Sequence, residues 1–143
     1  MSNAGLIEGN FTGVSGPGST HKHSVIGTNV PKSKFTRAGW TMRHVRDTDS
    51  MAAGSPVLFM GYYLNTLDFG AETAGDSTNN PVMTPEDAWN VDTKTDDGKP
   101  GTGKVLDNYW DTCTVATTSA DIGAAYDLQV KTPECSLYFR QGF

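Results

Sequence analysis

Apolar and polar residues alternate with a period of two in residues 40–45 and again in residues 135–139. Side chains at alternate positions of a β-strand point to the same face of a sheet, so each stretch predicts a half-buried strand. The residues that share one face are Trp40, Met42 and His44 in the first stretch and Cys135, Leu137 and Phe139 in the second.

Residues 57–64 are apolar throughout and rich in aromatic side chains. Such a run is expected of a strand covered on both faces, so this segment is predicted to be the centre of the sheet. A shorter strand is expected around Val105. Residues 70–81 are dense in Gly, Ser, Thr and Asn and predict a mobile loop.

A short helix is predicted over residues 84–94. Thr84 suits the N-cap, Pro85 suits the first helical position, and two acidic residues follow in the first turn, where the helix dipole favours negative charge. The side chains expected to pack on the sheet are Ala88, Trp89 and Val91. One Pro and three Gly in residues 98–103 then end the helix in a turn.

These elements predict an α+β, mainly β fold: an antiparallel sheet with one short helix and long loops. At 143 residues the chain has the length of one domain, assigned here to residues 5–143. The 16 Gly and 7 Pro also favour short elements joined by many turns. Residues 1–4 are interpreted as a cloning scar or as a cut made inside a longer chain.

The formal net charge of −5 argues against nucleic-acid binding, because phosphate contacts require a basic surface. The longest apolar run, residues 56–64, is about half the length that a membrane helix needs. No basic and apolar signal-peptide pattern follows Met1. We therefore expect a soluble domain that contains no membrane span.

Two cysteines, Cys113 and Cys135, enclose 21 residues. Neither belongs to a CxxC motif and both have polar turn residues beside them, which favours a disulfide. A loop of this size would gain roughly 3 kcal/mol of stability from the bond. Two reduced cysteines in the core are the alternative.

Residues 98–104 have the spacing of a phosphate-binding loop, but no buried strand precedes them and Val105 stands where such loops carry Ser or Thr. A surface turn is the preferred interpretation. The carboxylates of Asp92, Asp96 and Asp97 are close enough in sequence to hold calcium, yet the EF-hand pattern fails. We expect these side chains to cap turns by accepting hydrogen bonds from backbone amides.

Neither catalytic residues nor a cofactor or metal site are predicted. His21 and His23 lie in a Gly/Ser-rich loop, and His44 is expected to be a packed imidazole without an acid or nucleophile at motif spacing. An enzyme would require a cleft that joins His44 to a carboxylate. The tryptophans are expected in the core, although exposed rings would suit a carbohydrate-binding surface.

Residues 84–103 resemble a segment of proteobacterial proteins that carry a prepilin-type N-terminal cleavage and methylation signal. In those proteins a short helix bearing a Trp leads into a D-x-K-x-D-D-G-x-P-x-x-G loop, which residues 92–103 match at each specified position. The strings GLIEG at residues 5–9 and VPKSK at residues 30–34 look like two further stretches of such proteins, in the same order. The cysteines, ending in CSL at residues 135–137, are similar to the disulfide-closed terminal region of pilins.

The resemblance, which spans most of residues 5–143, implies the globular head of a type IV pilin or a type II secretion pseudopilin, a structural protein and not an enzyme. The family's leader and long apolar helix have no counterpart here, so the head is expected without its membrane anchor. Its implied partners are other pilin subunits, reached through that helix, and the pilus or secretion machinery. Its implied location is periplasmic or extracellular. The alternative function is an extracellular binding module for cell adhesion, carbohydrate or calcium.

Overall fold

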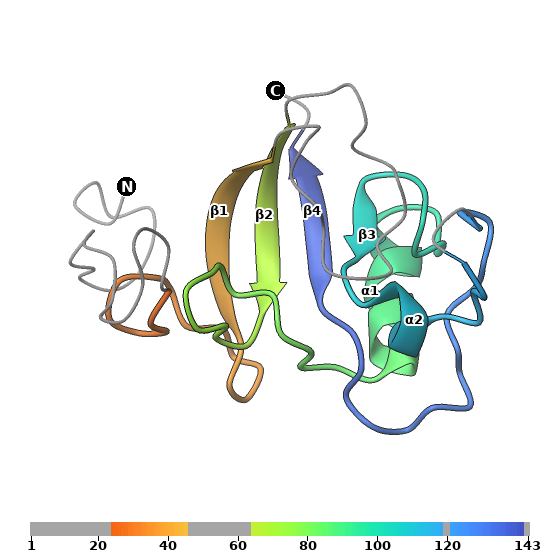
Figure 1. Cartoon of the computed structure of the whole chain (residues 1–143), viewed down its shortest axis with the longest axis horizontal. Helices are drawn as coiled ribbons and strands as arrows, with labels where there is room; N and C mark the ends of the chain where they lie inside the picture. Colours follow the sequence, from red (N-terminus) through yellow and green to blue (C-terminus); the bar gives the residue numbers. More distant parts are fainter. Residues whose placement is uncertain (1–23, 46–63, 119–120, 142–143) are drawn as a thin grey trace.

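The computed structural model describes residues 24–45, 64–118 and 121–141 (Figure 1). In these ranges the chain forms four strands and two helices. They are β1 (Gly39–Val45), β2 (Leu64–Gly70), α1 (Pro85–Thr95), β3 (Val105–Asp107), α2 (Trp110–Cys113) and β4 (Leu137–Gln141).

The four strands form one antiparallel sheet in the order β1-β2-β4-β3. The two central strands, β2 and β4, pair through Phe69 and Leu137, and β1 joins them through Trp40 opposite Phe69. On the other edge, Val105 of β3 lies opposite Phe139. The prediction of an α+β, mainly β fold with an antiparallel sheet is confirmed.

One central strand, β2, was not predicted. The predicted central strand at residues 57–64 lies outside the described residues except for Leu64, which begins β2. Within β2, Thr66 and Asp68 alternate with Leu67 and Phe69, and both polar side chains are fully buried. Thr66 and Asp68 lie on the face of the sheet away from Phe69, where other polar residues cover them. The strand therefore lacks the continuous apolar run that is typical of a central strand.

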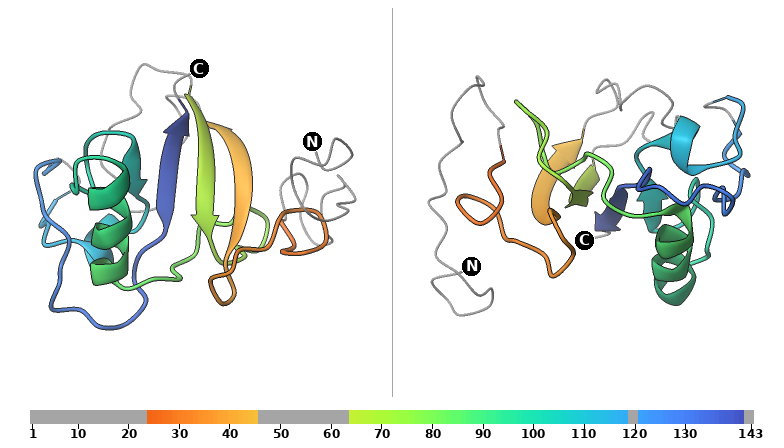
Figure 2. Two further views of the ribbon diagram at one scale, coloured as in Figure 1. Left: turned by 180° about the vertical axis from the view of Figure 1, so that it is seen from behind. Right: turned by 90° about the horizontal axis from the view of Figure 1, so that it is seen from below.

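The two edge strands differ in how far they are covered. Figure 2 shows α1 on the side of the sheet where β3 and β4 lie, away from β1. As a result, Met42 is 57% exposed and His44 is also exposed, while Trp40 is half-buried. The strand prediction for residues 40–45 is confirmed, but the expectation of a packed His44 imidazole is wrong.

The hydrophobic core lies between the apolar face of the sheet and α1. The Trp40 ring packs against Phe69 and Phe139 at centroid distances of 4.5 and 5.7 Å. The fully or largely buried members of the core are Ala38, Phe69, Met83, Ala88, Val105, Cys113, Tyr126, Cys135 and Leu137.

The start of α1 follows the local signals in its sequence. Thr84 is the N-cap and accepts a hydrogen bond from the Asp87 amide at 3.2 Å, and Pro85 occupies the first turn. Ala88 is buried and Val91 packs against the core, as predicted. Trp89 was expected to pack as well, yet it is 39% exposed, because Pro85, Ala88 and Asp92 at helical spacing form the buried stripe.

Residues 70–81 were predicted to be a mobile loop, but Ser77, Thr78 and Asn79 are buried. The Thr78 hydroxyl donates to the Asp68 carbonyl at 3.2 Å, and the Asn79 carbonyl accepts from Asn108 and Ser136. Polar composition here reflects internal hydrogen bonding. Neither helix of the described chain has the length or apolar run that a bilayer crossing requires.

Candidate functional site

The acidic loop, residues 92–103, comprises the last turn of α1 and the turn that leads toward β3, and its carboxylates accept hydrogen bonds from its own backbone. Asp92 Oδ1 accepts a hydrogen bond from the Gly98 amide at 3.2 Å. Asp97 Oδ1 accepts from the Lys99 amide at 2.9 Å, and Asp97 Oδ2 accepts from the Thr102 hydroxyl at 2.5 Å. These side chains cap turns, as the sequence predicted for them.

Asp96 caps the end of the loop. Its Oδ2 accepts hydrogen bonds from the amides of Lys104 and, at 3.3 Å, Val105, the residue that begins β3. A Cβ atom at Gly103 would collide with this carboxylate, and Gly103 has a φ of 73°. Glycine is therefore required here both for space and for backbone conformation. Residues 98–104, whose spacing resembles that of a phosphate-binding loop, form a turn between α1 and β3. This agrees with the interpretation that the sequence analysis preferred.

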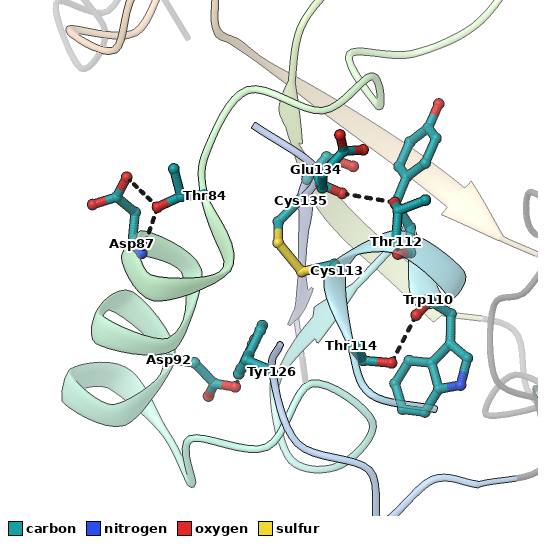
Figure 3. Close-up of a disulfide and its surroundings, with 12 residues drawn as sticks. Thr84, Asp87, Asp92, Trp110, Thr112, Cys113, Thr114, Tyr126, Glu134 and Cys135 are labelled. Atoms are coloured by element: carbon teal, nitrogen blue, oxygen red, sulfur yellow. Dashed lines mark hydrogen bonds between the residues drawn. A yellow bond between two sulfur atoms is a disulfide. The ribbon is translucent and has the colours of Figure 1, made fainter. Parts of the chain in front are cut away.

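A buried hydrogen bond joins the acidic loop to the C-terminal part of the chain. The Tyr126 hydroxyl donates to Asp92 Oδ2 at 2.9 Å (Figure 3). Burial raises the pKa of Asp92 to about 6, although the hydrogen bonds from Tyr126 and Gly98 act in the opposite direction. Asp92 is thus the internal anchor of the loop, and its side chain is fully covered.

One oxygen from each of Asp92, Asp96 and Asp97 lies within 4.8 Å of the others. Carboxylate oxygens gathered in this way are the donor type that calcium prefers. In this loop, however, every one of the three side chains already accepts a hydrogen bond from a backbone amide. Turn capping therefore explains why the three carboxylates lie close together.

A disulfide joins Cys113 to Cys135, with 5.1 Å between their Cα atoms. It ties the end of α2 to the chain just before β4, and both cysteines are fully buried (Figure 3). The Thr112 hydroxyl donates to the Glu134 carbonyl at 3.3 Å beside it. The chain from residue 114 to residue 134 is thereby closed into a loop whose two ends are fixed.

The disulfide-closed loop packs on the acidic loop through more than Tyr126. Trp110 of α2 is fully buried between them: its Nε1 donates to the Thr118 carbonyl at 3.0 Å, and a Cβ atom at Gly101 would come within 2.5 Å of its ring. A Cβ atom at Gly101 would come within 2.6 Å of the Ile122 carbonyl oxygen. The two loops are therefore in direct contact with each other.

The face of the sheet away from Trp40 and Phe69 carries an ion pair that was not predicted from the sequence. Arg43 Nε lies 2.9 Å from Asp68 Oδ2, and the Asp68 side chain is fully buried. The Arg43 guanidinium also stacks 5.1 Å from the centre of the Tyr138 ring. Burial raises the pKa of Asp68, and the charge of Arg43 offsets this effect only in part. The alternation of polar and apolar residues in β1 was the available signal, since it places Arg43 and Met42 on different faces of the sheet.

His44 lies on the exposed edge strand β1. Its Nδ1 pairs with Asn65 Oδ1 at 2.9 Å on the exposed edge of the sheet. His21 and His23 lie outside the described residues. Of the tryptophans, Trp110 is in the core as expected and Trp89 is partly exposed.

Comparison of the chain with protein-family models, with curated proteins and with solved structures finds no match.

Proposed function

We propose that this chain is the globular head of a bacterial filament subunit, in a type IV pilus, a type II secretion pseudopilus or a related assembly. The observation that carries the proposal is the acidic loop. The residues that match the prepilin-type pattern D-x-K-x-D-D-G-x-P-x-x-G are those that the fold uses to build this loop and to attach it to the disulfide-closed region.

The arrangement suits a protein with a mechanical role. A four-stranded sheet supplies a rigid centre, and the disulfide fixes the chain directly before the terminal strand β4. Disulfides persist in oxidising compartments, which supports a periplasmic or extracellular location. In this proposal the head forms the outer part of the filament, and an N-terminal apolar helix carried by the complete subunit makes the contacts between subunits.

A structural role also agrees with how the chemically active side chains are used. The acidic side chains of the loop accept hydrogen bonds from their own backbone. The imidazole of His44 pairs with an amide on an exposed edge. These contacts stabilise the fold, as a structural role requires.

The experiment that tests the proposal uses the natural gene, including the sequence upstream of Gly5, with an epitope tag in its native host. We expect the tagged protein in filaments sheared from the cell surface, and we expect this signal to disappear in a strain that lacks the prepilin peptidase. Secretion as a free protein in both strains would contradict the proposal. So would an open reading frame that encodes no apolar helix before Gly5.

The alternative of an extracellular binding module makes different predictions. A calcium-dependent module would show a rise in melting temperature with calcium that EDTA reverses, and a carbohydrate-binding module would give hits on a glycan array. For a filament head, we expect neither result. The variant Asp92→Asn is the control for any calcium effect, because it removes one of the three carboxylates of the cluster. A rise in melting temperature that depends on calcium binding to this cluster should be smaller in that variant.

A further inference from the structure

A pocket of about 600 Å³ lies between the hairpin that leads into β1 and the chain that follows β2. Figure 1 shows this hairpin beside β1, at the opposite edge of the sheet from β3. The volume is in the range of pockets that bind small molecules. Among the described residues, two apolar and four polar or charged side chains line the pocket: Ile26 and Ala71, and Lys32, Thr36, Arg37 and Glu72.

Hydrogen bonds of the protein itself hold the walls of this pocket. Lys32 pairs with Gly39 as an antiparallel bridge, which closes the hairpin. The Ile26 amide donates to Glu72 Oε1 at 2.7 Å and joins the chain before the hairpin to the chain after β2. Asn80 Nδ2 donates to the Glu72 carbonyl at 2.6 Å. Because these contacts form without a ligand, less order has to be created when one binds.

Positive charge is concentrated in the segment that forms one wall. Residues 24–45 contain four Lys or Arg residues and no Asp or Glu, although the whole chain has a formal net charge of −5. Arg43 is used in the ion pair with Asp68. Lys32 and Arg37 line the pocket, and neither forms an ion pair with another described residue. Two cations without a protein counter-ion in one pocket favour an anionic ligand.

Arg37 occupies a backbone conformation that favours glycine. Its φ is 66°, and within the described ranges it is the one non-glycine residue with a positive φ. The side chain is exposed, so packing in the core does not account for an arginine at this position. A disfavoured backbone conformation points to function when the side chain has a task. Its place in the lining of the pocket supplies such a task.

Glu72 restricts which anion fits this pocket. Its Oε1 is taken by the Ile26 amide, and Oε2 accepts no hydrogen bond from the described residues. A carboxylate accepts hydrogen bonds and cannot donate them, so an anion that presents only acceptors is repelled here. A ligand that carries a hydroxyl as well as a carboxylate satisfies both the cations and Glu72. The Thr36 hydroxyl can serve as a further donor.

We propose that this pocket binds a small hydroxylated carboxylate. Its carboxylate groups pair with Lys32 and Arg37, its hydroxyl donates to Glu72 Oε2, and its carbon skeleton contacts Ile26 and Ala71. The site goes beyond the filament role and does not depend on it, since every residue of the site belongs to the head.

The test measures the binding of malate, succinate and inorganic phosphate to the full chain by isothermal titration calorimetry. Malate and succinate differ by one hydroxyl. A chelating resin removes metal ions beforehand, so that metal binding by malate does not contribute. The variants Lys32→Met and Arg37→Gly each remove one cation of the pocket. Lys34→Met is the matched control, because this exposed lysine belongs to the same hairpin and is not among the lining residues.

We expect wild type to bind malate about tenfold more tightly than succinate, because succinate leaves a carboxylate oxygen without its hydrogen bond, and to bind phosphate more weakly than malate. Lys32→Met and Arg37→Gly should each weaken malate binding at least about tenfold. Lys34→Met should bind malate as wild type does. No binding of malate to wild type would overturn the proposal. So would equal binding of malate and succinate, or an equal loss in Lys34→Met and Lys32→Met, since the latter indicates general attraction by a basic surface.

The melting temperatures separate lost binding from lost folding. Arg37→Gly should melt at or above the wild-type temperature, since glycine adopts a φ of 66° without strain, and yet it should lose malate binding. Wild-type affinity for malate in this variant would overturn the proposal.

A further variant, Glu72→Gln, tests the place of the ligand hydroxyl. Its amide oxygen can still accept from the Ile26 amide, and its NH₂ group then presents a donor to the pocket. Succinate should therefore bind more tightly than to wild type, and the preference for malate should disappear. An unchanged preference for malate in Glu72→Gln would overturn the assignment of the hydroxyl to Glu72.

Discussion

The hydroxyl of Tyr126 donates a hydrogen bond to Asp92 Oδ2 at 2.9 Å, with both residues buried. This contact links the helix that begins the acidic loop to the disulfide-closed part of the chain, 34 residues further on. It attaches the segment that resembles prepilin-type proteins to the disulfide-closed part of the chain.

Removal of this link should destabilise the fold. We expect Tyr126→Phe to lower the free energy of unfolding by about 1–3 kcal/mol, because it leaves a buried carboxylate oxygen without its partner. Tyr109→Phe is the matched control, since that hydroxyl bonds Asn80 at 2.9 Å from a position that is only half-buried, and we expect a smaller loss. Urea denaturation of both variants checks the prediction. An equal loss in the two would contradict it.

Stability should fall as the pH rises through the range in which Asp92 ionises. The pKa of Asp92 is about 6 in the folded protein, against an ordinary value of 3.8. The stability that its protonated form contributes is therefore fully present below about pH 4 and is lost as the pH rises through about 6. Burial acts in the same direction on Asp68 and Asp107. We expect a lower free energy of unfolding at pH 7.5 than at pH 4.5.

The variant Asp92→Asn tests the assignment of this pH dependence. It cannot ionise, so the difference in unfolding free energy between pH 4.5 and pH 7.5 should shrink relative to wild type. Asp111→Asn, an exposed position, is the control and should leave the difference unchanged. Wild-type stability that rises over the same range would refute the assignment.

Gly103 should not tolerate a side chain. Both its φ of 73° and the Asp96 carboxylate oppose a Cβ atom, so we expect Gly103→Ala to destabilise by about 1–3 kcal/mol. Gly27→Ala isolates the backbone effect, because Gly27 has a φ of 82° and nothing within 4 Å of the added atom. Gly123→Ala, whose nearest neighbour would be 3.9 Å away, should be close to neutral. Thermal denaturation should therefore rank Gly103→Ala as the least stable.

The ion pair between Arg43 and Asp68 should matter far more than an exposed pair. Arg43→Met leaves a fully buried carboxylate without its counter-ion, and we expect a loss of about 3–5 kcal/mol. Lys131→Met removes an exposed pair with Glu86 at 3.1 Å and should change stability by less than about 1 kcal/mol. The double variant Arg43→Met with Asp68→Leu should recover much of the loss. Urea denaturation measures all three, and a double variant as unstable as Arg43→Met would contradict the argument.

Local patterns in the sequence were sufficient for α1 and for three of the strands, whereas α2 and β2 were not predicted. The N-cap at Thr84 and the turn after Gly98 depend on neighbouring residues alone, so they are readable without the fold. The capping role of the three aspartates in the acidic loop follows from the same kind of short-range hydrogen bonding. Pairing of Cys113 with Cys135 needed only that the chain has two cysteines.

The tertiary structure decided which faces are covered, because burial depends on elements that are distant in sequence. The position of α1 over β3 and β4 leaves Met42 and His44 exposed at the β1 edge. Asp68 is buried because Arg43, 25 positions earlier, neutralises it, and that pairing exists only once β1 and β2 are in register. Likewise, only the antiparallel pairing of β3 with β4 brings Asp107 beside the sulfur atoms of Cys113 and Cys135.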